Sequence, residues 1–100
     1  MQIDTQIYLI DKNNDEQELI LVLEFDGEIT RNGVSTFASQ ETLSIVSIEF
    51  AEIPFTGLEL LLDYHFPDNN ILTVWDMISE AANGELEHIF EEQYLQSTGA

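Results

Sequence analysis

Residues 66–78 read FPDNNILTVWDMI, and the spacing of the apolar side chains changes within this stretch. Upstream of it, apolar and polar residues alternate, as they do along strands. Downstream, apolar residues recur at intervals of three and four, which is the spacing of one face of a helix. These residues are Ile71, Leu72, Val74, Trp75 and Ile78. Because the intervening Pro67–Asn70 forms a turn that ends in residues able to cap a helix, the sequence predicts strands followed by helix.

The helical pattern continues with Leu86, Ile89, Phe90 and Tyr94, to about residue 96. Asn83-Gly84 lies between the two halves and is typical of a helix C-terminus. An interior glycine costs a helix only about 1 kcal/mol, however, so a continuous helix is equally compatible with the pattern. We therefore expect one long or two short C-terminal helices over 70–96.

Residues 1–66 are predicted to be rich in strands. Apolar residues alternate from Ile3 to Leu9, from Glu18 to Phe25, from Leu43 to Phe50 and from Leu58 to Phe66. The second of these segments is apolar on both faces for part of its length, which indicates a central strand. In the third segment, Val46, Ile48 and Phe50 are expected to share one face.

Two turns are expected between these strands. Asp11–Asp15 clusters Asp and Asn side chains that bond their own backbone. Asn32-Gly33 between β-branched residues favours a two-residue hairpin, and a plain surface loop is the alternative there. The fold class is therefore α+β, with an antiparallel sheet of about four to five strands inside a single acidic domain, 1–100.

Charge is the strongest functional signal. Twenty Asp and Glu residues face only Lys12 and Arg31, so the formal net charge is -18. Such a surface repels nucleic acid and acidic membranes and attracts basic partners. Adaptation to high salt would also produce an acidic, lysine-poor chain, but the abundance of Ile and the excess of Glu over Asp argue against it.

Cysteine is absent, which excludes disulfides and thiolate metal sites. The first residues lack a basic region followed by an apolar run, and no apolar stretch approaches the ~18 residues of a membrane span. We therefore expect a cytoplasmic location. The oligomeric state stays open.

The acidic residues of the helical segment form a pattern. Asp76, Glu80, Glu87 and Glu91 are spaced to form one stripe if the helix is continuous, and Glu85 and Glu92 are expected to flank it. Neighbours four apart are separated by about 6 Å along the axis, of the same order as the spacing of phosphates on a nucleic-acid strand. A one-signed face is unusual, because like charges four apart destabilise a helix. The alternative is an ordinary solvated face.

Glu59 and Asp63 form a second predicted acidic row, on the solvent side of the strand over 58–66. Further carboxylates cluster near the ends of other strands, at Glu24 and Glu49. If the helix stripe and the solvent face of the sheet were contiguous, they would present one large negative surface to a basic partner.

Signs of catalysis or cofactor binding are weak. Glu85-Leu86-Glu87-His88 contains Glu-x-x-His, but a di-iron site needs a second such motif and two further glutamates, and His65 lies on a predicted strand. No glycine-rich phosphate loop or nucleophile signature is present. We expect no enzyme activity, no metal and no cofactor.

Small size, strong acidity, absence of cysteine and an acidic helix together resemble the phage and mobile-element proteins that inhibit CRISPR effectors, restriction enzymes or other nucleases by mimicking DNA. The resemblance implies a DNA-mimic inhibitor that occludes the groove of a basic nucleic-acid-binding protein. The charge pattern, and not the resemblance, selects the expected contacts, which are Asp76, Glu80, Glu87, Glu91, Glu85, Glu92, Glu59 and Asp63. The alternative is a phage structural, assembly or adaptor protein. Such a protein would bind through apolar strand edges and residues such as Trp75 or Tyr94, and its charge would serve solubility alone.

Overall fold

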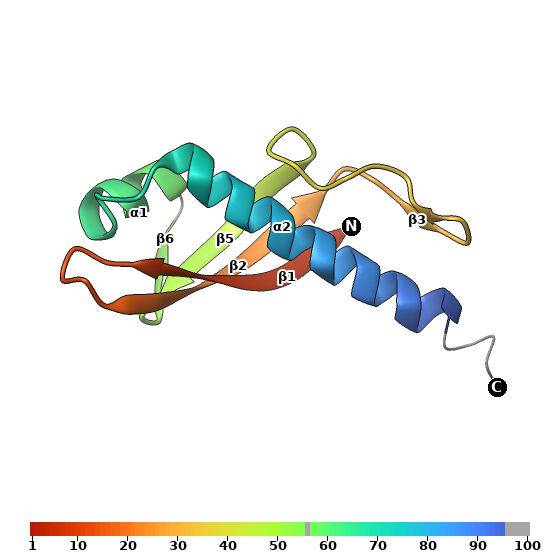
Figure 1. The fold of residues 1–100 in the computed structure, drawn as a ribbon, viewed down its shortest axis with the longest axis horizontal. Coiled ribbons are helices and arrows are strands. Elements are labelled where there is room, and N and C mark those ends of the chain that lie inside the picture. The colour runs from red at the N-terminus through yellow and green to blue at the C-terminus, as the bar shows by residue number, and fades with distance from the viewer. Residues whose placement is uncertain (56, 96–100) are drawn as a thin grey trace.

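The computed structural model describes residues 1–55 and 57–95 and confirms the α+β class (Figure 1). The strands are β1 (Gln2–Ile10), β2 (Glu16–Phe25), β3 (Ile29–Thr30), β4 (Gly33–Val34), β5 (Leu43–Phe50) and β6 (Ile53–Phe55). The helices are α1 (Leu58–His65) and α2 (Ile71–Phe90), and α2 runs directly into a π-helical turn, Glu91–Leu95. The predicted helix end at residue 96 lies outside the described residues.

The main sheet is antiparallel, with strand order β1-β2-β5-β6. The predicted central position of β2 is confirmed. Leu19, Leu21 and Leu23 point to one face of the sheet and are fully buried, because successive side chains of a strand alternate between faces. Ile20 points to the other face and is 45% exposed. β2 is thus central because it pairs with β1 and β5, although only one of its two apolar faces is covered.

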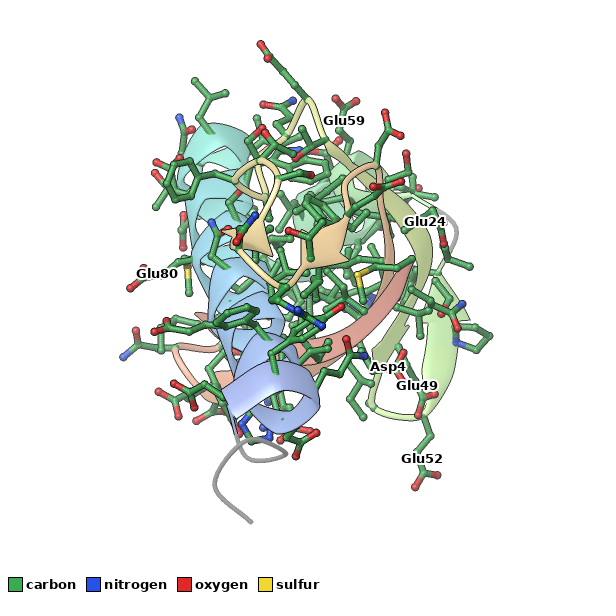
Figure 2. All side chains as sticks on the ribbon, turned by 90° about the vertical axis from the view of Figure 1, so that its right-hand side faces the viewer. Asp4, Glu24, Glu49, Glu52, Glu59 and Glu80 are labelled. Atoms are coloured by element: carbon green, nitrogen blue, oxygen red, sulfur yellow. The ribbon has the colours of Figure 1, made fainter. Side chains whose placement is uncertain are left out.

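The fold has two layers. α2 crosses one face of the sheet, and the opposite face is open to solvent (Figures 1 and 2). The side of α2 that meets the sheet carries four buried residues, Val74, Ile78, Ala82 and Leu86. α1 adds Leu58, Leu61 and Leu62 to the same core. All buried residues in the described part of the chain are apolar, so the core contains no buried charge.

The predicted strand over 58–66 is wrong, because this segment forms helix α1. Leu60 and Tyr64, which the alternating pattern placed on a buried side, are 53% and 66% exposed. Leu58, Leu61 and Leu62 are buried instead, at the helical spacing of three and four. A run of leucines fits both periods, and leucine and glutamate favour helix, so intrinsic propensity decides between them.

β5 contains a bulge that overturns the predicted position of Val46. Ile45 pairs with Leu23 and Ser47 pairs with Val22, so Val46 has no partner on β2. The extra residue turns Val46 outward, where it is 56% exposed, while Ile48 remains buried. The expected grouping of Val46 with Ile48 on one face is therefore wrong.

β6 is a short edge strand that the sequence did not predict. Ala51 and Glu52 connect it to β5 with φ values of 52° and 66°, the left-handed conformation required of a tight hairpin turn. Neither residue type favours that conformation. Pro54 lies in β6, where an edge position tolerates a residue without an N–H donor.

The two predicted turns are confirmed. Thr30 pairs with Gly33, so the β3–β4 turn residues are Arg31 and Asn32, one position earlier than Asn-Gly alone suggests. Gly33 has a φ of 119°, which other residues rarely adopt.

In the β1–β2 turn, the carboxylate of Asp11 accepts hydrogen bonds from the N–H groups of Asn13 (2.8 Å) and Asp15 (3.0 Å) and from the side chain of Gln17 (2.9 Å). These bonds, the one from Asp15 first, lower the pKa of Asp11, since they favour its charged form.

α2 is continuous through Gly84, which settles the alternative left open by the sequence. Asn70 caps its N-terminus, as predicted, by accepting a hydrogen bond from the N–H of Leu72 at 2.8 Å. The side chain of Asn83 does not end the helix. Its Oδ1 accepts from the N–H of Ala38 at 2.8 Å and its Nδ2 donates to the carbonyl of Ala38 at 3.0 Å. None of the helices in the described ranges is long and apolar enough to cross a bilayer.

Candidate functional site

The outer side of α2 carries the predicted row of carboxylates. We call Asp76, Glu80, Glu87 and Glu91 the helix stripe; all four are exposed. At about 100° per residue, they fall within an arc of about 60° and extend over about 22 Å of helix axis. The continuity of α2 is what aligns them, because a break at Gly84 would turn Glu87 and Glu91 away from Asp76 and Glu80.

The helix stripe lies opposite the buried side of α2. Glu80, near its middle, points away from the sheet (Figure 2). No hydrogen bond or ion pair is made by the four carboxylates with any other side chain of the described residues. The row therefore consists of free, one-signed charge on a rigid support.

Glu85 and Glu92 do not flank the helix stripe, and that expectation is wrong. Helical geometry turns Glu85 about 180° and Glu92 about 160° from Asp76. Glu85 is half-buried and lines a hollow beside β1, together with Asp4 and Gln6. Glu92 lies 3.1 Å from Nε2 of His88, one turn earlier.

Glu59 and Asp63 are exposed on α1 rather than on a strand. They are four residues apart, so the helix keeps them on one side. Both line a shallow hollow with Asn69 and Ile71, close to the start of α2. Glu59 and Glu80 point in different directions (Figure 2), so the two acidic pairs do not form one row.

A second acidic surface, which sequence reasoning did not identify as a unit, covers the open side of the sheet. We call it the sheet face; its carboxylates are Asp4, Glu16, Glu18, Glu24 and Glu49. Four of them occupy even-numbered positions on β1 and β2. The two-residue alternation of side chains along a strand could therefore have placed them on one face from the sequence alone. Exposed apolar side chains lie among them, namely Tyr8, Ile10, Ile20 and Val46.

The helix stripe and the sheet face are not contiguous. Figure 2 shows Asp4, Glu24 and Glu49 on one side of the molecule and Glu80 on the other, with both layers of the fold between them. The expected single negative surface is therefore wrong. A partner that contacts one of these surfaces leaves the other free.

The carboxylates of the sheet face are partly engaged within the fold. The hydroxyl of Tyr8 donates to Glu18 at 3.1 Å, and this hydrogen bond, together with the charge of Glu18, raises the pKa of Tyr8. Glu24 forms an ion pair with the N-terminal amine at 3.2 Å. Among residues 1–55 and 57–95, the helix stripe has no comparable contacts.

Both cationic side chains lie at the ends of the molecule. Lys12 is in the β1–β2 turn and Arg31 in the β3–β4 turn, at opposite ends of the 49 Å long axis (Figure 1). The body of the molecule between these two turns is therefore without lysine or arginine.

Trp75 and Tyr94, the apolar contacts expected of an adaptor, are both half-buried. Trp75 packs against the core. The ring of Tyr94 lies 5.5 Å from that of Phe90. The most exposed large apolar side chain in the described ranges is Phe37, at 84%, which sequence reasoning also missed.

Over residues 1–55 and 57–95, no three His, Asp or Glu side chains converge on a point where they could hold a metal ion. No protein-family model, curated protein or solved structure matches this chain.

Proposed function

We propose that this protein is a non-catalytic, DNA-mimic inhibitor. The helix stripe binds the cationic groove of a nucleic-acid-binding protein, of the nuclease or CRISPR-effector kind, and occludes it. Asp76, Glu80, Glu87 and Glu91 take the places of phosphates, with Glu59 and Asp63 as outlying contacts. The protein then acts in the cytoplasm of the cell that contains its partner.

One observation carries the proposal: four exposed carboxylates, which make no hydrogen bond or ion pair with any described side chain, are aligned along α2 and the π-helical turn that continues it. Like charges four residues apart destabilise a helix, and solubility does not require them to be aligned. A cationic groove would relieve that repulsion, and it would release the counterions held around the stripe, as a protein releases those held around DNA. The negative field would also accelerate the encounter.

A pull-down from lysate tests this proposal. The immobilised protein is exposed to lysate at about 50 mM salt and washed at about 300 mM, since contacts to a phosphate-like row weaken steeply over that range. We expect capture of a nucleic-acid-binding protein, displacement by duplex DNA, and loss of capture when Glu80, Glu87 and Glu91 are replaced by lysine. A partner that stays bound in the presence of duplex DNA and is still captured by the charge-reversed variant would refute the proposal.

A second candidate is an adaptor or assembly protein that binds through the sheet face. It is favoured by the exposed apolar residues Tyr8, Ile10, Ile20 and Val46 on an uncovered sheet. In that case, capture would survive reversal of the helix stripe, resist high salt and be lost when Ile20 and Val46 are replaced by serine.

A further inference from the structure

Phe37 is displayed to solvent on a backbone that is held in place. Its side chain is 84% exposed, while the next residue, Ala38, is 3% exposed. Asn83 of α2 binds both the N–H and the carbonyl of Ala38, and the hydroxyl of Thr42 donates to the carbonyl of Phe37 at 3.0 Å. An aromatic ring held at such a position loses little backbone freedom when a partner covers it.

A groove of about 460 Å³ lies beside this ring, between the 34–37 segment and the C-terminal half of α2. Val34, Leu86 and Phe90 supply its apolar lining, together with Phe37. Isolated exposed apolar residues are normal on protein surfaces, but one that lines an apolar groove resembles the anchor of an interface.

Two of the four polar side chains that line the groove are already engaged. Asn83 binds Ala38, and the hydroxyl of Ser35 accepts from the N–H of Glu28 at 2.9 Å. Few polar groups are left to orient a small polar ligand, which argues for an apolar occupant. The other two are the hydroxyl of Thr36 and the carboxylate of Glu87, which also belongs to the helix stripe. Charge complementarity therefore favours an apolar side chain flanked by cations.

We propose that the groove binds a large apolar side chain from a basic segment of the same partner that the helix stripe attracts. This inference rests on the proposed function and deepens it, because it assigns the two surfaces different tasks. The helix stripe provides attraction that salt weakens. The groove provides an apolar contact that salt does not weaken and that slows dissociation.

Two synthetic peptides of equal positive charge serve as probes: a lysine- and arginine-rich peptide with a central leucine, and the same peptide with serine in its place. Their binding is measured by fluorescence anisotropy at about 50 mM and about 300 mM salt. We expect the leucine peptide to bind about tenfold more tightly, the factor expected for burying most of one aliphatic side chain. This ratio should persist at both salt concentrations.

Phe37→Ser should reduce the ratio to about one. Leu72→Ser is the matched control, because Leu72 is 63% exposed on α2, the helix that forms one wall of the groove, but does not itself line the groove. It should leave the ratio unchanged. Glu80→Lys with Glu91→Lys should weaken both peptides while the ratio remains. The urea midpoint of Phe37→Ser should match that of the wild type, since the ring makes little contact with the core.

Equal binding of the two peptides to the wild-type protein would overturn the groove proposal and leave the helix stripe standing. A ratio that survives Phe37→Ser would do the same. If the stripe substitutions weakened the binding of neither peptide, the result would instead count against the proposed function. A wild-type dimer in sedimentation that Phe37→Ser converts to monomer would assign the groove to a second copy of this chain and overturn the inference.

Discussion

The helix stripe and the sheet face are both acidic, but they hold their charge differently. Carboxylates of the stripe repeat along one rigid helix and make no hydrogen bond or ion pair with other described side chains. On the sheet face, Glu18 and Glu24 are engaged by Tyr8 and the N-terminal amine, and apolar side chains lie between the carboxylates. Part of the charge on the sheet face therefore contributes to the fold. The charge of the stripe is engaged by no hydrogen bond or ion pair within the described residues, which is why we assign the partner to it.

The largest expected effect tests whether the sheet face is open. Leu21 is fully buried and Ile20, its neighbour on β2, is 45% exposed. We expect Leu21→Ala to lower the free energy of unfolding by about 2–4 kcal/mol and Ile20→Ala by less than about 1 kcal/mol. Urea denaturation at several protein concentrations measures both. Equal losses of stability would mean that the sheet face is covered in solution, and would contradict its description as an open surface.

The next test concerns the continuity of α2, on which the helix stripe depends. A Cβ atom added at Gly84 would meet no atom within 4 Å. Gly84→Ala should therefore stabilise the protein by about 0.5–1 kcal/mol in thermal or urea unfolding, as alanine does in helix interiors. Gly33→Ala is the control and should destabilise, because Gly33 has a φ of 119°. Destabilisation by Gly84→Ala would show that the helix is interrupted there.

A smaller effect separates the two kinds of charge. Glu80→Gln removes the repulsion between Asp76 and Glu80, so it should stabilise the protein by about 0.2–0.5 kcal/mol at low salt and by less at high salt. Glu24→Gln makes the same change in net charge but also removes an ion pair with the N-terminal amine. Its gain should be smaller. Identical gains in stability from the two variants would mean that the net charge of the protein, and not the position of the carboxylate, sets its effect on stability.

The smallest effect concerns ionisation on the sheet face. Because the hydrogen bond to Glu18 raises the pKa of Tyr8 above 10.0, Glu18→Gln should lower it. A raised pKa in the folded state stabilises the fold below pH 10.0, and this contribution is lost as the pH rises through the folded-state pKa of Tyr8. Titration of the Tyr8 ring by NMR measures the shift. Glu24→Gln should leave it unchanged, and a shift of equal size there would remove the special role of Glu18.

Local signals in the sequence were sufficient for much of the fold. The period of three and four identified α2, the Asn70 cap marked its start, and alternation identified β1, β2 and β5. The β3–β4 hairpin followed from Asn32-Gly33, although its turn residues are Arg31 and Asn32. Each of these features depends on a pattern within a few residues, which is why sequence alone predicts it.

Other features depend on contacts that no local pattern encodes. The leucines of α1 fit strand and helix equally, and Val46 turned outward only because β5 bulges against β2. Ala51 and Glu52 carry no turn signal. For the site, the row from Asp76 to Glu91 was predicted, but its separation from the sheet face depends on how α2 packs. Asn83 looked like a helix stop because Asn-Gly is typical of one. Its actual role, a bond to Ala38, spans 45 residues and leaves no local pattern.

The most direct test of the central claim compares two variants of equal charge. One carries Glu80→Lys, Glu87→Lys and Glu91→Lys on the helix stripe; the other carries Asp4→Lys, Glu16→Lys and Glu49→Lys on the sheet face. Each reversal changes the charge by two, so both variants carry -12 in place of -18. The measurement is capture of a DNA-displaceable, nucleic-acid-binding protein from lysate. We predict that the stripe variant loses capture and that the sheet-face variant retains it. Equal loss from both variants, or loss from the sheet-face variant alone, would contradict the assignment of the partner to the helix stripe.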